Sequence, residues 1–190
     1  MENSVLQKLL DGNSRFVAGS PDRPRQSAKR RAEIAEHQHP EAIIVSCSDS
    51  RVPPEIIFDQ GLGDLFVIRT AGKMIDNAAL ASAEYAALHL HVPLIVILGH
   101  KRCGAVKAAV DGGDHHGHLT QLVNAMQSAV ENARSQEGDL LDNAVKENVK
   151  NVVKQLKTSE PILVEMVNGG KLEVVGAYYD LDTGAVSLVQ

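Results

Sequence analysis

The chain has 190 residues, of which 44% are hydrophobic and 23% charged, a balance typical of one globular domain with a buried core. Its formal net charge of -5 argues against general nucleic-acid binding, which needs a basic surface. No stretch reaches the roughly 20 apolar residues that span a bilayer, and the first residues do not resemble a secretory signal. Two cysteines are too few for a disulfide framework, so we expect a cytoplasmic protein whose thiols serve chemistry.

The first part of the chain is predicted to be a helical arm. Apolar residues recur at helical spacing over residues 4–18, and a Pro-rich extended stretch follows over residues 20–24. A charged helical segment over residues 28–37 ends before Pro40. We therefore expect an N-terminal helical arm over residues 1–38 of a single domain that spans residues 1–190.

Short continuous apolar runs predict strands that are covered on both faces. They lie at residues 41–47, 65–69 and 94–98. Helices are predicted between and after these strands, at residues 77–90, 101–110, 119–134 and 140–156. Strands that alternate with helices indicate parallel βαβ units.

The last part of the chain carries turn signals. Asn168-Gly169-Gly170 predicts a hairpin between strands at residues 162–167 and 172–179. Asp182-Thr183-Gly184 predicts a further turn before residues 185–189. The expected fold is α/β: a single domain with a mostly parallel central sheet flanked by helices and with an antiparallel C-terminal edge.

Reactive side chains follow the first predicted strand. In an extended chain Cys47, Asp49 and Arg51 point to one side. They would meet at the carboxyl end of a strand, where ligands bind in open α/β sheets. An adjacent guanidinium would keep the carboxylate ionised.

A second reactive segment follows the strand at residues 94–98. His100 and Cys103 are three residues apart, so one helical turn brings both to the same face. The first-turn amides around Gly104 would offer a site for an anion.

Together the two segments supply two thiols and one imidazole. Three protein ligands with one open position are typical of catalytic zinc, which lowers the pKa of bound water toward roughly 7. Each feature alone has a simpler explanation: a buried cysteine is often only a small core residue, and Asp49–Arg51 alone reads as a structural ion pair. From the residues, the reaction class is a metal-assisted hydrolase or hydratase.

The motifs Cys47–Glu55 (CSDSRVPPE) and Gly99–Val106 (GHKRCGAV) closely resemble those of the β-carbonic anhydrases. The resemblance extends to residues 10–16, 63–72 and 176–184, and so runs nearly from end to end. It implies reversible hydration of carbon dioxide to bicarbonate and a proton by zinc-bound hydroxide, in a homodimer or a larger even-numbered homo-oligomer. Membrane and nucleic-acid partners are not expected.

By this resemblance Cys47, His100 and Cys103 bind Zn²⁺, while Asp49 and Arg51 form the catalytic pair beside the open position. It also assigns substrate-binding positions, whose members in this chain are Gln38, Phe66, Tyr85 and Gly104. The family's common RNAGN segment reads Arg69-Thr70-Ala71-Gly72-Lys73 here. Two positions beside the substrate cleft that the resemblance implies therefore differ.

Other functions stay open at this stage. Carbonyl sulfide and carbon disulfide hydrolases resemble the same family and share its metal motifs. A non-catalytic zinc- or bicarbonate-binding protein is an alternative of another class. A thiol redox protein is disfavoured, because the two cysteines lack the C-x-x-C spacing.

Overall fold

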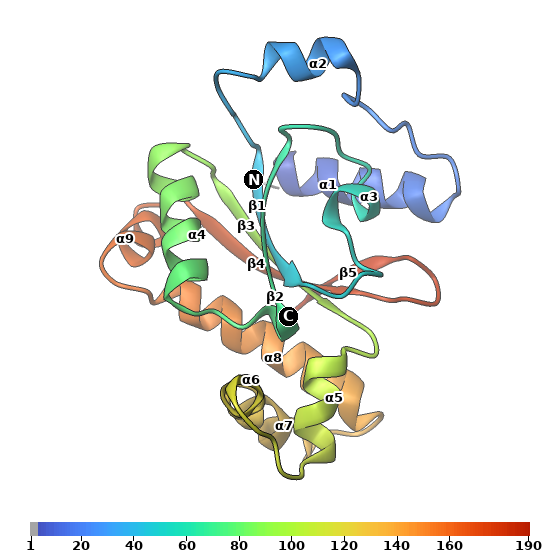
Figure 1. The fold of residues 1–190 in the computed structure, drawn as a ribbon, viewed down its shortest axis with the longest axis vertical. Helices are drawn as coiled ribbons and strands as arrows, with labels where there is room; N and C mark the ends of the chain where they lie inside the picture. Colours follow the sequence, from blue (N-terminus) through green and yellow to red (C-terminus); the bar gives the residue numbers. More distant parts are fainter. Residues whose placement is uncertain (1–3) are drawn as a thin grey trace.

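The computed structural model describes residues 4–190, which fold around one five-stranded sheet (Figure 1). The strands are β1 (Ala42–Cys47), β2 (Leu65–Thr70), β3 (Leu94–His100), β4 (Glu173–Tyr179) and β5 (Val186–Val189). Their order is β2-β1-β3-β4-β5. The first four strands are parallel, and β5 is antiparallel to β4. The predicted mostly parallel sheet with an antiparallel C-terminal edge is confirmed.

Helices cover both faces of the sheet and its carboxyl edge (Figure 1). One face carries α1 (Ser4–Val17) and α3 (Pro54–Ile57); the other carries α4 (Asn77–His89), α8 (Leu140–Lys157) and α9 (Ile162–Asn168). Beyond the carboxyl ends lie α5 (Gly104–Asp111), α6 (His118–Asn124) and α7 (Gln127–Ala133). The short helices α2 (Ala28–Glu33) and η1 (Ala71–Lys73) complete the described elements.

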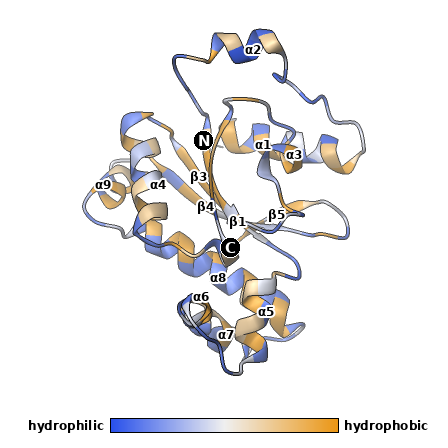
Figure 2. Ribbon diagram, viewed as in Figure 1, coloured by the Kyte–Doolittle hydropathy of each residue, from blue (hydrophilic) through white to orange (hydrophobic). Residues whose placement is uncertain are grey.

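Burial explains why the central strands were recognisable. Every residue of β1 and β3 is buried, because helices pack on both sides of these strands, and Figure 2 shows hydrophobic residues along them. The edge strand β5 has no buried residue. On α4 the inward residues are all alanines, whose small side chains let the helix approach the sheet closely.

The predicted hairpin around Asn168-Gly169-Gly170 is wrong. Residues 162–168 form the helix α9, and β4 pairs in parallel with β3 instead. The glycines end this helix: Gly170 has φ +68° and its N–H donates to Val167 O, a role that glycine takes readily at helix C-termini. The antiparallel edge arises at the later turn, Asp182-Thr183-Gly184, between β4 and β5.

Two predicted helices are shorter or divided. The segment predicted as one helix over residues 119–134 is split into α6 and α7 around Met126, whose side chain is buried. The helix predicted over residues 28–37 ends at Glu33. Residues 1–3 of the predicted arm lie outside the described residues.

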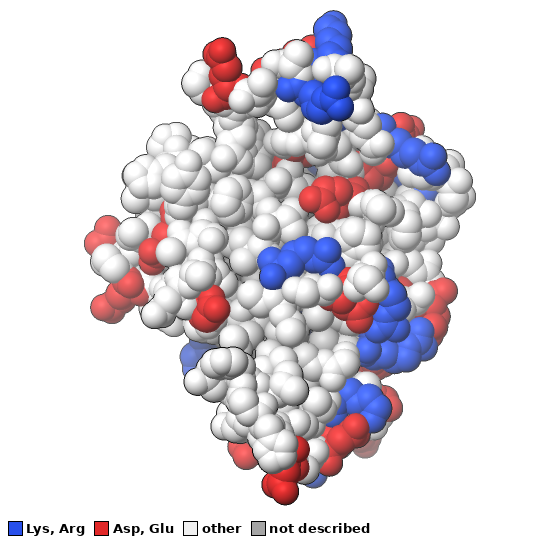
Figure 3. All heavy atoms as spheres, in the orientation of Figure 1, with Lys and Arg blue, Asp and Glu red and all other residues white. Residues whose placement is uncertain are grey.

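The arm is attached to the domain by its first helix. Asn13 in α1 donates to Ile57 O and to Gly184 O, and Arg15 pairs with the buried Asp59. Within residues 4–190, no helix has the length and apolar character needed to cross a membrane. On the face drawn in Figure 3, few charged side chains lie over α4.

Candidate metal centre

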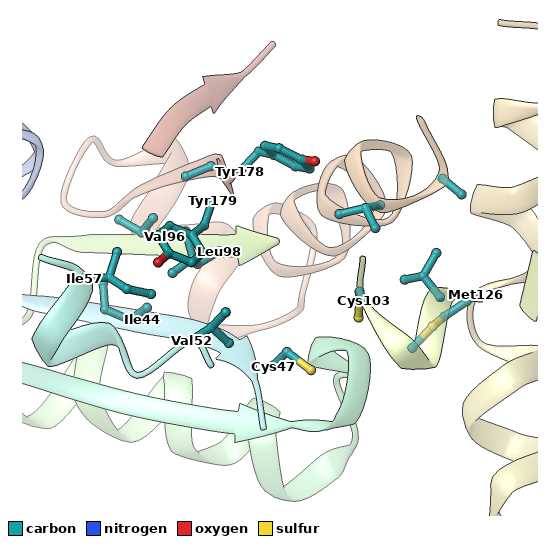
Figure 4. Packing of buried hydrophobic residues seen from close by; sticks show 14 of the residues in the cluster. Ile44, Cys47, Val52, Ile57, Val96, Leu98, Cys103, Met126, Tyr178 and Tyr179 are labelled. Atoms are coloured by element: carbon teal, nitrogen blue, oxygen red, sulfur yellow. The ribbon is translucent and has the colours of Figure 1, made fainter. Parts of the chain in front are cut away.

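The structure brings Cys47, His100 and Cys103 together at the carboxyl edge of the sheet. Cys47 ends β1, His100 ends the neighbouring strand β3, and Cys103 is the N-cap residue of α5. All three are buried, and their potential ligand atoms lie within 4.8 Å of one another. Figure 4 shows the two cysteines at this edge, one at the tip of β1 and one ahead of α5. The set forms because parallel neighbours end on the same side.

The imidazole is oriented for metal binding. His100 Nδ1 lies 2.9 Å from Lys101 O; since a carbonyl only accepts, Nδ1 carries the proton. His100 Nε2 is buried and has no hydrogen-bond partner in the described part of the chain. A buried, unpaired nitrogen beside two sulfur atoms is the donor set that Zn²⁺ prefers, and the carbonyl fixes the tautomer as in known zinc sites. The residues therefore fit zinc.

The two thiols differ in their surroundings. The neighbouring Cys103 thiol and then the His100 imidazole lower the pKa of Cys47, and Gly72 N–H donates to Cys47 Sγ at 3.3 Å. The neighbouring Cys47 sulfur, together with burial, raises the pKa of Cys103. The pKa of each thiol thus depends on the other sulfur, and both sulfur atoms lie within reach of one metal ion.

Asp49 is held beside this cluster by Arg51. The guanidinium donates from Nε to Oδ1 at 3.0 Å and from Nη2 to Oδ2 at 2.7 Å, and Arg51 N–H also donates to Oδ1. These hydrogen bonds hold the pKa of Asp49 well below its ordinary value. Asp49 Oδ2 lies 3.9 Å from His100 Nε2. The structure thus holds an ionised carboxylate at the edge of the metal cluster, paired with Arg51.

Arg69 supports the first ligand segment in a way that sequence analysis missed. From β2 its Nε donates to Cys47 O at 2.9 Å and its Nη2 to Asp49 O at 2.6 Å. The pairing of β1 with β2 creates this contact, since Arg69 stands opposite Ser46 in the register. A single arginine thereby fixes the backbone at both Cys47 and Asp49.

Lys73, one of the two unusual positions, is buried behind the cluster. It is 1% exposed, and this burial lowers the pKa of its ammonium. The nearby sulfur atoms of Cys103 and Cys47 act in the opposite direction and raise that pKa, but by less. Its Nζ lies 3.6 Å from the position that a Cβ on Gly99 would occupy. The preceding turn is fixed by Asn148, whose amide donates to Gly72 O at 3.1 Å. The sequence marked this position as different but contained no signal that it lies in the interior.

The predicted substrate-binding residues are not all brought to the metal cluster. Gly104 begins α5 directly after Cys103. Gln38 and Tyr85 instead line a separate hollow of about 330 Å³, and the ring of Phe66 lies 6.3 Å from that of Tyr85. Phe66 stands opposite Ile43, four residues before Cys47 in β1, which is roughly 13 Å along a strand. The two rings of Phe66 and Tyr85, together with Gln38 from the same hollow, are called the aromatic patch.

The comparisons with known proteins agree with this centre. The family model described as carbonic anhydrase matches residues 42–186, a span that contains all three cluster residues. The chain is similar to the solved β-carbonic anhydrase CcaA, with 30% identity and a TM-score of 0.77 over 98% of this chain and 96% of that one. The chain belongs to the β-carbonic anhydrase family.

Further relatives extend the likeness over nearly the full length. Carbonic anhydrase 2 of Mycobacterium tuberculosis is 46% identical over 189 residues, which are 97% of this chain and 91% of the relative. The carbonic anhydrase of Mycolicibacterium smegmatis is 44% identical over 97% of this chain and 92% of that protein. One of two tetrameric β-carbonic anhydrases from Sordaria macrospora has a TM-score of 0.78 at 26% identity, covering 98% of both chains. The protein is a zinc-dependent carbonic anhydrase, a carbon–oxygen lyase.

Proposed function

We propose that this enzyme interconverts carbon dioxide and bicarbonate at a zinc ion held by Cys47, His100 and Cys103. The observation that carries the proposal is the unpaired His100 Nε2, buried within 4.8 Å of both cysteine sulfur atoms. Zinc bound there supplies Lewis-acid chemistry and a nucleophile derived from water at neutral pH.

Asp49 and Arg51 are assigned the positioning of the reacting groups. The carboxylate stays ionised because Arg51 donates to both of its oxygens, so it can only accept hydrogen bonds. As an acceptor 3.9 Å from His100 Nε2, it would orient an O–H group bound next to the cluster. The proton released in the reaction would pass to buffer, because the carboxylate stays ionised. A purely structural metal site has no use for such a pair, which argues against a non-catalytic zinc-binding role.

Carbon dioxide hydration measured by stopped flow, with zinc content determined in parallel, tests the proposal. The same preparation is assayed with carbonyl sulfide and carbon disulfide. We expect carbon dioxide to be the substrate. Sulfide release without carbon dioxide hydration would contradict the assignment and favour a hydrolase on the same scaffold.

We further propose a homodimer, or a larger even-numbered assembly, in which the aromatic patch of one copy completes the cleft of the other. Phe66 lies opposite Ile43, roughly 13 Å along the sheet from Cys47 in its own chain, so this residue of the patch does not reach the metal cluster of the same chain. Tyr85 is 48% exposed, and few charged side chains lie over its helix α4 on the face drawn in Figure 3. A large exposed aromatic with little charge around it is typical of an interface. Light scattering coupled to gel filtration measures the assembly; a monomer would contradict this proposal.

A cytoplasmic location is proposed from the thiols. Cys47 and Cys103 are both free and buried at the metal cluster, and zinc binding requires them to stay reduced, as the cytosol keeps them. Detection of the protein in the cytosolic fraction of its source cell tests this location, and recovery only from an oxidising compartment would contradict it.

A further inference from the structure

The loop from His100 to Cys103 carries two of the three zinc ligands in an unfavourable backbone conformation. Arg102, between them, has φ +53°. This left-handed region is disfavoured for residues with a side chain and persists only when the surrounding structure enforces it. Contacts outside the loop must therefore hold it in shape.

The turn between β4 and β5 supplies these contacts. The guanidinium of Arg102 donates two hydrogen bonds to the carboxylate of Asp182, with Nη1 at 3.2 Å from Oδ2 and Nη2 on Oδ1. Lys101 Nζ lies 3.1 Å from Asp182 Oδ2 and 3.3 Å from Asp180 Oδ2. The loop backbone is also tied to β4, since Lys101 N–H donates to Tyr179 O at 2.9 Å. Both cations of the loop are thus held by one acidic turn.

The turn is itself well defined. Asp180 Oδ1 accepts hydrogen bonds from the N–H groups of Asp182 at 2.7 Å and of Thr183 at 3.3 Å. Its backbone carbonyl accepts from Gly184 N–H at 2.8 Å. Asp182 therefore contacts the loop from a fixed position.

The carbonyls of the loop in turn contact the metal centre. Lys101 O accepts the hydrogen bond from His100 Nδ1, which leaves Nε2 free for the metal. Arg102 O accepts a hydrogen bond from Arg51 Nη2 at 3.3 Å, and Arg51 holds Asp49. A short chain of contacts thus joins Asp182 to a zinc ligand on one side and to the Asp49–Arg51 pair on the other.

We propose that Asp182 is a positioning residue for the metal centre: through Arg102 and Lys101 it keeps the His100–Cys103 loop in the conformation that binds zinc. The inference rests on the proposed zinc roles of His100 and Cys103. Exposed ion pairs contribute little to global stability, and Arg102 and Asp182 are each 51% exposed. The effect is therefore local and appears in metal retention, because residues that orient first-shell ligands strongly influence metal affinity.

The rate of zinc release to a chromogenic chelator, measured on the zinc-loaded enzyme, tests the proposal. We expect Asp182→Asn to accelerate release roughly five- to tenfold, near the lower end of the losses seen for outer-shell partners. Asp182→Glu, which keeps the charge, should restore most of the retention. Asp111→Asn is the matched control, because Asp111 forms an ion pair with Lys107 on α5, is similarly exposed at 55%, and lies outside the loop.

Arg102→Gly provides a second variant that separates the contact from the backbone strain. Glycine adopts a positive φ without penalty, so this variant keeps the loop conformation accessible while it removes the guanidinium. We expect faster zinc release than in the wild type, and Asp182→Asn combined with Arg102→Gly should release zinc more slowly than the product of the two single effects predicts.

Three results would overturn the proposal: wild-type zinc release in Asp182→Asn, equal acceleration in Asp111→Asn, or fully multiplicative effects in the double variant. The midpoint of thermal unfolding distinguishes this positioning role from a general structural role. A general structural role would lower the midpoint in Asp182→Asn relative to Asp111→Asn without a specific change in zinc release. Zinc release is measured without any substrate. If carbon dioxide hydration is absent while release still responds to Asp182, only the proposed function fails.

Discussion

Arg51 donates two hydrogen bonds to Asp49, at 3.0 Å and 2.7 Å, while Asp49 Oδ2 lies 3.9 Å from the unpaired Nε2 of His100. The guanidinium therefore determines both the charge of this carboxylate and the direction of its lone pairs. Its planar fork matches the two oxygens, which a lysine ammonium cannot do.

Arg51→Lys should consequently lower carbon dioxide hydration by about 100-fold, in the range of losses for misplaced acid–base groups, although it keeps the positive charge. Zinc content should stay at the wild-type value, because Arg51 is not one of the three cluster residues. Stopped-flow rates and metal analysis on the same samples give both quantities. Full activity in the lysine variant would show that charge alone is sufficient.

Cys103→Ser is expected to reduce zinc from about one ion per chain to nearly none, because a three-ligand site that loses a thiolate binds the metal far more weakly. Metal analysis after gel filtration measures the loss. Ser46→Ala is the matched control: its hydroxyl is buried next to Cys47 but has no hydrogen-bond partner among the described residues. Wild-type zinc in Cys103→Ser would remove Cys103 from the ligand set.

Two inactive variants should restore activity when they form mixed assemblies, if the aromatic patch serves the neighbouring copy. A Cys103→Ser chain lacks zinc but has Tyr85, and a Tyr85→Ala chain binds zinc but lacks the ring. Each mixed dimer then contains one site with zinc and an intact Tyr85. We expect about a quarter of the wild-type rate after equal mixing and reassembly, since half of the dimers are mixed and each has one complete site. A rate equal to the mean of the two separate variants would place Tyr85 with the metal of its own chain.

Asp59 should make the stability of the protein sensitive to acid. Burial by itself raises the pKa of Asp59, but hydrogen bonds from Arg15 and from two backbone N–H groups outweigh it, and the pKa lies below its ordinary value. Arg15 Nε donates at 2.7 Å to this carboxylate, whose side chain is only 2% exposed. A lowered folded pKa means that this stability is present above the unfolded pKa of about 3.9 and is lost as the pH falls through the folded value.

Arg15→Met should therefore lower the free energy of unfolding of the metal-free protein by about 1–3 kcal/mol at pH 7, and by clearly less at pH 3. Urea unfolding at the two pH values measures the difference. Lys29→Met is the control, because Lys29 is 88% exposed and only 4.0 Å from Glu33, so its effect should be near zero at both. An equal loss at both pH values would contradict a contribution from the Asp59 charge.

Gly12 is required by packing although it lies within helix α1. A Cβ at this position would stand 1.9 Å from Phe58 O, a backbone atom, so the helix would have to move. Gly12→Ala should cost about 1–3 kcal/mol of unfolding free energy through overpacking, despite the roughly 1 kcal/mol that alanine gains in helix propensity. Ser14→Ala on the exposed face of the same helix should be neutral or stabilising. Equal stability of the two variants in urea would show that α1 does not pack closely here.

Much of the fold and the centre of the site could be predicted from local pattern. The strands β1 and β3 are covered on both faces, and burial on two faces selects uninterrupted apolar runs such as those ending at Cys47 and before His100. Cys47 and His100 end two neighbouring parallel strands, and Cys103 comes three residues after His100. Recognising the strands was therefore enough to place the three predicted ligands at one edge. The ordinary chemistry of thiol and imidazole then indicated zinc.

Contacts between distant segments decided the rest. The segment 162–168 is too short for its pattern to distinguish a strand from a helix. It forms α9 and does not join the sheet beside β3, because β4 already occupies that edge. The position of Arg69 depends on the register of β1 and β2, the burial of Lys73 on the packing of α8 near Gly99, and the contact of Asp182 with Arg102 on the β4–β5 turn. Local sequence encodes which residues are buried and where the chain turns. Only the assembled sheet and helices determine which residues, far apart in the chain, meet around the metal ligands.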